Sequence, residues 1–131
     1  MTGDWLCTPA WLLVGITESV PAVLELVEQR LTLTSVEGQV FSVPLAAIER
    51  VIFPWHYFGG GAKFRVNDRV YRVSFVKPNG AEVVPARLLA MTGVGLGAGL
   101  ATVVQKMVDI RDGRRVGRAW KTVLDALRSE T

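Results

Sequence analysis

The segment from residue 63 to residue 75 constrains the fold most, because its pattern predicts a β-hairpin with a fixed register. Two alternating stretches flank Asn67 and Asp68, which tolerate the left-handed backbone of a two-residue turn. Such a turn places Phe64 opposite Tyr71 and Arg65 opposite Val70. One face of the hairpin is then apolar, and the other is mainly basic. The apolar face carries Phe64, Val66, Tyr71, Val73 and Phe75, and the basic face carries Lys63, Arg65, Val70, Arg72 and Ser74.

Further strands are expected before this hairpin. Residues 22–27 and 30–34 place leucines alternately on one face, and Glu28 and Gln29 lie between them, so a second hairpin is predicted. Residues 45–48 are expected to form a turn or helical corner. The remaining expected strands are residues 11–16, for which a short helix is the alternative, 39–43 and 49–53.

The C-terminal part of the chain has a helical pattern. Residues 81–89 are expected to form a weak helix interrupted by Pro85. Residues 114–127 form an amphipathic pattern with one apolar stripe. That stripe consists of Val116, Trp120, Val123, Leu124 and Leu127. A length of 131 residues suits a single domain, with strands over about 11–76 and helices over about 81–128.

Charge is distributed unevenly along the chain. Residues 1–60 hold two basic and six acidic side chains, a net of −4, whereas residues 61–131 hold thirteen basic and six acidic, a net of +7. The first residues lack the positive charge of a secretory signal, so a cytoplasmic location is expected. The single cysteine, Cys7, excludes an internal disulfide framework.

The order of these elements resembles the pleckstrin-homology-like superfold, including bacterial GRAM-type domains. The matching pieces are LELVEQRLTLTSVEGQVFSVPLAAIERVIF, AKFRVNDRVYRVSF and GRAWKTVLDAL. The resemblance implies a mainly β (α+β) fold, an antiparallel barrel or roll of six or seven strands with C-terminal helices. It also implies that the last helix plugs one open end with Trp120, and that the domain binds lipid headgroups or protein partners. Phosphoinositide-binding members carry several basic residues at the first hairpin loop, where this chain has only Arg30 beside Glu28.

An uncharged, glycine-rich stretch covers residues 88–104. Its candidate close-packing glycines are Gly93, Gly95, Gly97 and Gly99. A dinucleotide site would need a βαβ unit around these glycines, and none is visible. The 17 uncharged residues are short for a bilayer, which needs about 20. Membrane contact, self-association and packing on the sheet all remain open, and the last of these is favoured.

An aromatic loop and a basic cluster are the other candidate binding sites. Aromatic residues beside three glycines could wedge into a membrane interface, grip a peptide or, as favoured here, simply cap the barrel mouth. This candidate interaction loop is Trp55, His56, Tyr57 and Phe58. Basic side chains on the second hairpin and the last helix could bind an anion or lipid, or could form an ordinary solvated face. These candidates are Lys63, Arg65, Arg72, Arg111, Arg114, Arg115, Arg118 and Lys121.

Catalysis has little support in the sequence. There is no recognisable nucleophile motif and only one histidine, so no enzymatic activity, cofactor or metal is expected. The leading hypothesis is a non-catalytic binding or scaffolding module for a protein partner, with self-association as one form. The alternative is peripheral association with an anionic membrane through the basic side chains. The acidic first half of the chain disfavours nucleic acid as a partner.

Overall fold

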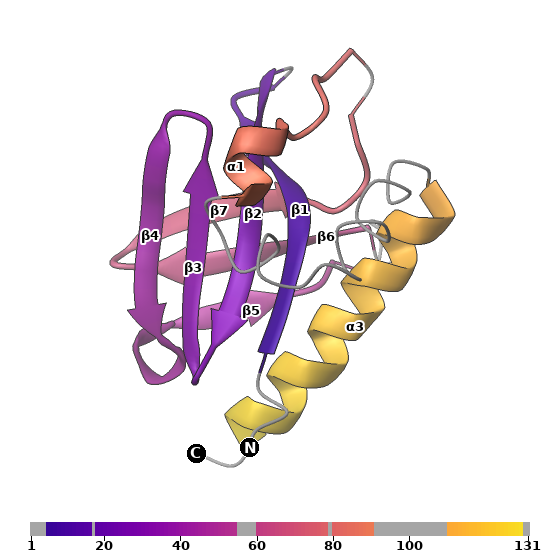
Figure 1. Cartoon of the computed structure of the whole chain (residues 1–131). Coiled ribbons are helices and arrows are strands. Elements are labelled where there is room, and N and C mark those ends of the chain that lie inside the picture. The colour runs from indigo at the N-terminus through magenta and orange to yellow at the C-terminus, as the bar shows by residue number, and fades with distance from the viewer. Residues whose placement is uncertain (1–4, 17, 55–59, 79, 91–109, 130–131) are drawn as a thin grey trace.

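The computed structural model describes residues 5–16, 18–54, 60–78, 80–90 and 110–129. These residues form a mainly β structure, a seven-stranded antiparallel sheet with helices after it (Figure 1). The strands are β1 (Trp5–Val14), β2 (Glu18–Val27), β3 (Arg30–Ser35), β4 (Gly38–Pro44), β5 (Arg50–Ile52), β6 (Gly61–Val66) and β7 (Arg69–Ser74). The helices are the short 3-10 turn η1 (Leu45–Ala47), α1 (Ala86–Ala90) and α3 (Ile110–Ser129).

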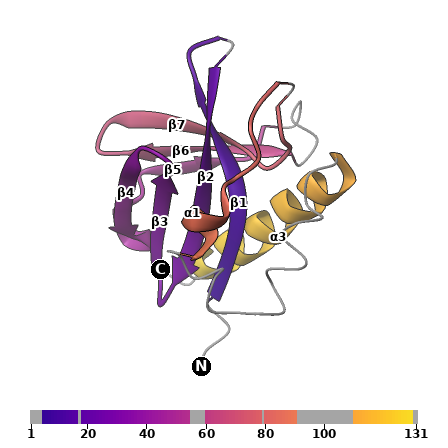
Figure 2. The same ribbon diagram turned by 45° about the horizontal axis from the view of Figure 1, so that its top comes forward.

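The sheet folds over on itself and is not closed. Strands follow the order β4-β3-β2-β1-β7-β6-β5, and the part formed by β1–β4 crosses the part formed by β5–β7 (Figures 1 and 2). The two parts are joined where Trp11–Leu13 of β1 pair with Arg72–Ser74 of β7. Among the strands that the structure describes, no ladder joins β4 to β5. The barrel or roll expected from the sequence is therefore observed as an open sheet.

Both predicted hairpins are confirmed. In the second one, Phe64 pairs with Tyr71 and Arg65 with Val70, as the two-residue turn requires. In the first one, Glu28 and Gln29 connect β2 and β3, and both have positive φ angles. The helical corner expected at residues 45–48 is present as η1.

The first two strands are longer than predicted. The strand expected at 11–16 begins at Trp5 and ends at Val14, and Ile16 lies fully exposed in the following turn. Each strand contains a proline, Pro9 or Pro21, which normally argues against a strand interior. Pro9 is tolerated because β1 has a partner on one side only there, and Pro21 lies beyond the β2–β3 ladder.

Two other predicted elements are shorter than expected. The strand expected at 49–53 spans only Arg50–Ile52. The helix expected at 81–89 begins after Pro85, at Ala86, and residues 81–85 are not helical. Proline lacks the N–H group of a helix interior but fits at a helix start, so the helix begins beside it.

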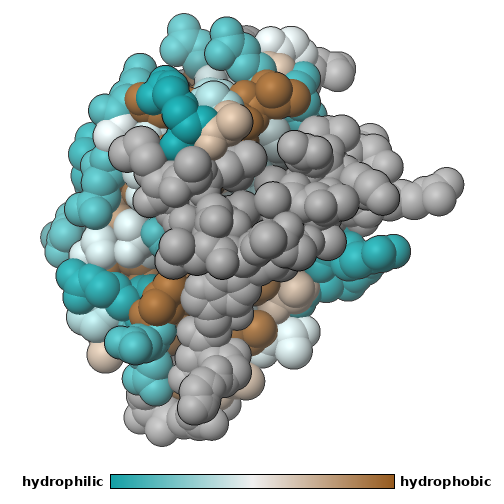
Figure 3. All heavy atoms as spheres, in the orientation of Figure 1, coloured by the Kyte–Doolittle hydropathy of each residue, from teal (hydrophilic) through white to brown (hydrophobic). Residues whose placement is uncertain are grey.

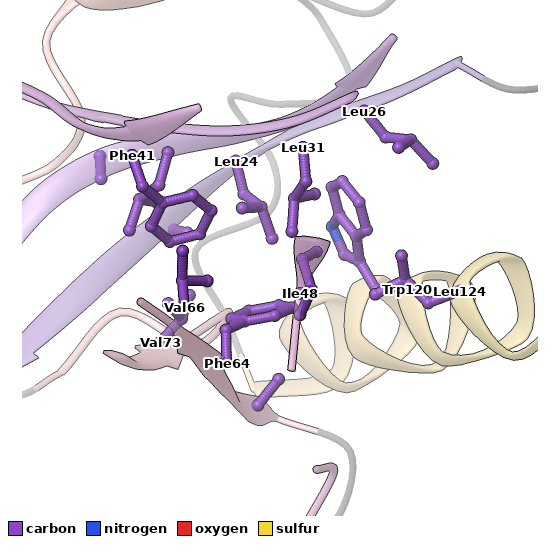
Figure 4. Close-up of a cluster of buried hydrophobic side chains, with 14 of the residues drawn as sticks. Leu24, Leu26, Leu31, Phe41, Ile48, Phe64, Val66, Val73, Trp120 and Leu124 are labelled. Atoms are coloured by element: carbon purple, nitrogen blue, oxygen red, sulfur yellow. The ribbon is translucent and has the colours of Figure 1, made fainter. Parts of the chain in front are cut away.

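The main core lies between the two parts of the sheet and α3. Side chains from both parts point toward each other, and those of Trp120 and Leu124 enter from the helix (Figure 4). The Trp120 ring stacks on Phe75 with 6.4 Å between ring centroids, and its Nε1–H donates to Thr8 Oγ1 at 2.8 Å. The burial expected for the apolar stripe of the last helix is therefore confirmed for Val116, Trp120 and Leu124.

A smaller buried cluster covers the opposite face of β1 and β2. It contains Cys7, Val23 and Leu88, and α1 supplies Leu88. Nearby, Trp11 is also buried, and its Nε1–H donates to the carbonyl oxygen of Glu82 at 2.9 Å. Strand β1 is thus covered on both faces, which explains why its sequence is a nearly continuous apolar run.

Candidate binding surface

The outward face of β5–β7 collects basic side chains. Because side chains alternate along a strand, Phe64 and Val66 of β6 point into the core while Lys63 and Arg65 point outward. In the β5–β6 ladder Arg50 is directly opposite Arg65, and in the β6–β7 ladder Lys63 is directly opposite Arg72. We call these outward residues the cationic face: Arg50, Lys63, Arg65 and Arg72, with the apolar Ile52 and Val70.

The charge of the cationic face is only partly neutralised. Arg65 lies 3.6 Å from a Glu49 carboxylate oxygen and 3.2 Å from one of Asp68. Arg72 donates through Nη2 to the carbonyl oxygen of Gly15, which carries no full charge. Within the described ranges, no ion pair joins Arg50, Lys63 or Arg72 to a carboxylate. Like charges directly opposite each other are unfavourable in a sheet, so both pairs disfavour the fold, although the carboxylates beside Arg65 offset part of the Arg50–Arg65 repulsion.

Apolar side chains interrupt these charges. Val70 is 60% exposed and Ile52 is 37% exposed. Val70 is opposite Arg65, and Ile52 is opposite Lys63, so each apolar side chain has a basic neighbour across the ladder. Scattered exposed apolar residues are common, but this mixture with arginine is also typical of protein interfaces.

A shallow hollow of about 260 Å³ lies beside the cationic face, at the junction of β1, β6 and β7. Gly61 is directly opposite Ser74, and this pair lies two residues along the strands from the Lys63–Arg72 pair. The lining is mostly apolar. It consists of Leu13, Gly60, Gly61, Val73, Ser74 and Val76. We call this feature the glycine hollow.

The basic side chains of α3 form a separate group. Arg114, Arg115 and Arg118 are exposed, and Lys121 Nζ lies 2.7 Å from Asp125 Oδ2. Arg111 belongs to the first turn of the helix. Helix α3 contacts β6 and contributes Val116, Trp120 and Leu124 to the core, whereas the cationic face points away from that core. The basic candidates predicted from the sequence are therefore divided into two surfaces.

The outer side of β3 and β4 is polar, and several of its side chains form hydrogen bonds with one another. The Arg30 guanidinium donates to Ser42 Oγ at 2.9 Å and to the Ser42 carbonyl oxygen at 3.1 Å. The Thr32 and Ser42 hydroxyls share a further hydrogen bond of 2.9 Å. Hydrophilic side chains predominate over these strands in the space-filling view (Figure 3). Arg30, the one basic residue of the first hairpin loop, is thus engaged within the fold.

Several sequence candidates lie outside the described residues. These are the aromatic loop, Trp55, His56, Tyr57 and Phe58, and the glycines Gly93, Gly95, Gly97 and Gly99. Sequence reasoning missed two parts of the surface. Arg50 and Ile52 join the cationic face through the β5–β6 ladder, and Gly61 forms part of the hollow. The alternation of Arg50, Val51 and Ile52 in the sequence indicates that Arg50 and Ile52 share one face of a strand. The sequence of so short a strand does not indicate that it pairs with β6.

The described part of the chain holds neither a metal-ligand cluster nor a membrane-spanning helix. It contains no group of three or more His, Cys, Asp or Glu side chains that could hold a metal ion. None of its helices combines the length and apolar character needed to cross a bilayer. No family model matches this chain, and no curated protein or solved structure is significantly similar to it.

Proposed function

We propose that this chain is a pleckstrin-homology-like, non-catalytic binding module that recognises an acidic surface of a protein partner. The fold assignment is supported by the order of the elements, seven antiparallel strands followed by a long helix. It is also supported by the burial of Trp120 at the end of the core where α3 packs. The function is argued from the site, because similar folds serve many functions.

The observation that carries the function is the pairing of like charges on the cationic face. Arg50 opposes Arg65, and Lys63 opposes Arg72, although opposite charges at these positions would favour the fold. A cost in stability at a solvent-exposed position is typical of residues retained for binding. An acidic partner would neutralise these basic side chains and remove their mutual repulsion. Removal of the repulsion would make the binding free energy more favourable.

An acidic protein surface fits the cationic face better than a bilayer does. The carboxylates of Glu49 and Asp68 stand beside Arg65 and would repel anionic headgroups, whereas a protein partner can place its own groups around them. The second basic group belongs to α3, which packs against the core, whereas the cationic face points away from that core. A flat anionic membrane that meets one of these groups therefore gains little from the other.

The test compares two charge-reversal variants with equal changes in net charge. Arg50→Glu/Lys63→Glu alters the cationic face, and Arg115→Glu/Arg118→Glu alters exposed residues of α3 as the matched control. The binding of fluorescent poly-L-glutamate is measured by anisotropy at low salt. Loss of two exposed ion pairs of about 0.7 kcal/mol each should weaken binding by the first variant about tenfold.

The control variant decides whether the effect belongs to the cationic face. Equal loss in both variants would mean that poly-L-glutamate senses net charge alone, which contradicts the proposal. The same proteins are also sedimented with phosphatidylserine-containing and neutral vesicles. Strong binding to the anionic vesicles, lost in Arg50→Glu/Lys63→Glu, would transfer the function to a membrane surface and overturn the protein-partner assignment.

A further inference from the structure

The glycine hollow lies where β6 begins: Gly60 precedes the strand and Gly61 is its first residue. By alternation with Ala62, which belongs to the core, Gly61 faces the same side as Lys63. A side chain at position 61 would point to the same side as Lys63, toward this space. The strand therefore leaves an apolar depression next to its first basic residue.

The volume of the hollow suits one side chain. At about 260 Å³ it exceeds the cavity of about 150 Å³ that holds a benzene ring in another protein. It is smaller than the roughly 300–1,000 Å³ typical of sites for small molecules and cofactors. The hollow therefore has room for one large apolar side chain such as phenylalanine.

The cationic face begins two residues away from the hollow. The Gly61–Ser74 pair and the Lys63–Arg72 pair are separated along the strands by two residues, a distance of about 6.6 Å. In an extended peptide, side chains two residues apart have the same spacing and point to the same side. An apolar side chain in the hollow would thus bring a carboxylate two positions along the peptide over Lys63 and Arg72.

We infer that the glycine hollow is an anchor site for one large apolar side chain of an acidic, extended segment in the partner protein. The inference rests on the proposed function and adds to it the pattern that the module recognises, an acidic residue two positions from the apolar anchor. Buried apolar anchors usually dominate binding energy, while rim charges mainly set orientation and rate. The hollow therefore supplies specificity that a basic surface alone lacks.

The probes are three acetylated and amidated peptides that differ only in anchor or charge. They are Glu-Ser-Phe-Ser-Glu, Glu-Ser-Ser-Ser-Glu and Lys-Ser-Phe-Ser-Lys. Each is titrated into the full ¹⁵N-labelled chain, and amide shifts are followed at Gly60, Gly61 and Ser74. The acidic peptide with phenylalanine should bind about tenfold more tightly than the one with serine, and the basic peptide should bind least.

Three variants of the chain and one control variant separate the anchor from the charge. Gly61→Val fills the hollow and should bring the two acidic peptides to nearly equal affinity, while Ala119→Val, on the exposed side of α3, is the matched control. Leu13→Ser removes part of the apolar wall of the hollow. It replaces Gly61→Val in the same comparison if Gly61→Val does not fold. Lys63→Glu should weaken both acidic peptides.

The outcomes distinguish the anchor from the proposed function. Equal binding of the two acidic peptides to the unaltered chain, still weakened by Lys63→Glu, would overturn the anchor and leave the cationic face as the binding surface. Equal binding of the acidic and basic phenylalanine peptides would also overturn it, because charge would then play no part. If Lys63→Glu had no effect on any peptide, the anchor and the proposed function would fail together.

Discussion

Trp120 ties the last helix to the sheet, and its replacement gives the most quantitative test of the fold. Its side chain is fully buried, its ring stacks on Phe75, and its Nε1–H donates to Thr8 Oγ1. Burial of the ring contributes about 2–3 kcal/mol, the stack about 0.5–1.5 kcal/mol, and the hydrogen bond about 0.5–1.5 kcal/mol. Together these contributions amount to about 3–6 kcal/mol, which overlaps the roughly 3–5 kcal/mol measured for Trp→Ala changes in protein cores, so Trp120→Ala should lower the free energy of unfolding by an amount in that range.

Smaller changes resolve these contributions. Trp120→Phe keeps most of the apolar contact but removes the N–H donor, so a loss of about 1–2 kcal/mol is expected. Thr8→Val leaves the indole N–H without this acceptor and should cost a similar amount. Because both changes break the same bond, the double variant should lose less than the sum, by about 1 kcal/mol.

Urea denaturation followed by far-ultraviolet circular dichroism provides the assay. The midpoint should fall in Trp120→Ala with little change in the slope, and the melting temperature should fall by roughly 10–15 °C. A loss below about 1 kcal/mol in Trp120→Ala would show that α3 does not close the core. Strict additivity of Trp120→Phe and Thr8→Val would show that their hydrogen bond is absent in solution.

Three further stability measurements test other parts of the structure. Arg50→Glu, opposite Arg65, should stabilise the fold by about 0.5 kcal/mol at low salt and by less at high salt. Arg115→Glu is the control, and destabilisation by Arg50→Glu would contradict the like-charge pairing. Glu28→Asn/Gln29→Gly, at two positive φ angles, should stabilise by about 1 kcal/mol in urea, whereas a loss would refute the turn geometry. Leu88→Ala should cost about 2–3 kcal/mol, and no change would mean that α1 does not cover β2.

The hairpins could be predicted from the sequence because their information is local. Alternation and a two-residue turn together determine the register, so the pairing of Phe64 with Tyr71 followed from the chain alone. The apolar stripe of the last helix followed from helical spacing, and the resemblance to the pleckstrin-homology-like superfold added the burial of Trp120, which the structure has. For the hairpins and the stripe, the prediction needed only residues that are close together in the sequence.

The parts that sequence reasoning missed depend on contacts between distant segments. Pro9 and Pro21 argue against strands unless the lengths of the neighbouring ladders are known. Arg50 joins the cationic face only because β5 pairs with β6, and the hollow requires β1 beside β7. The division of the basic residues into two surfaces likewise follows from the packing of α3 against the core, from which the cationic face points away.

The most direct test of the central claim is a map of where an acidic chain binds. Poly-L-glutamate is titrated into the ¹⁵N-labelled protein, and amide shift changes are recorded along the sequence. Changes concentrated on β5–β7, at Arg50, Lys63 and Arg72, are predicted. Changes concentrated on α3, at Arg115 and Arg118, or spread evenly over all basic residues, would contradict recognition through the cationic face.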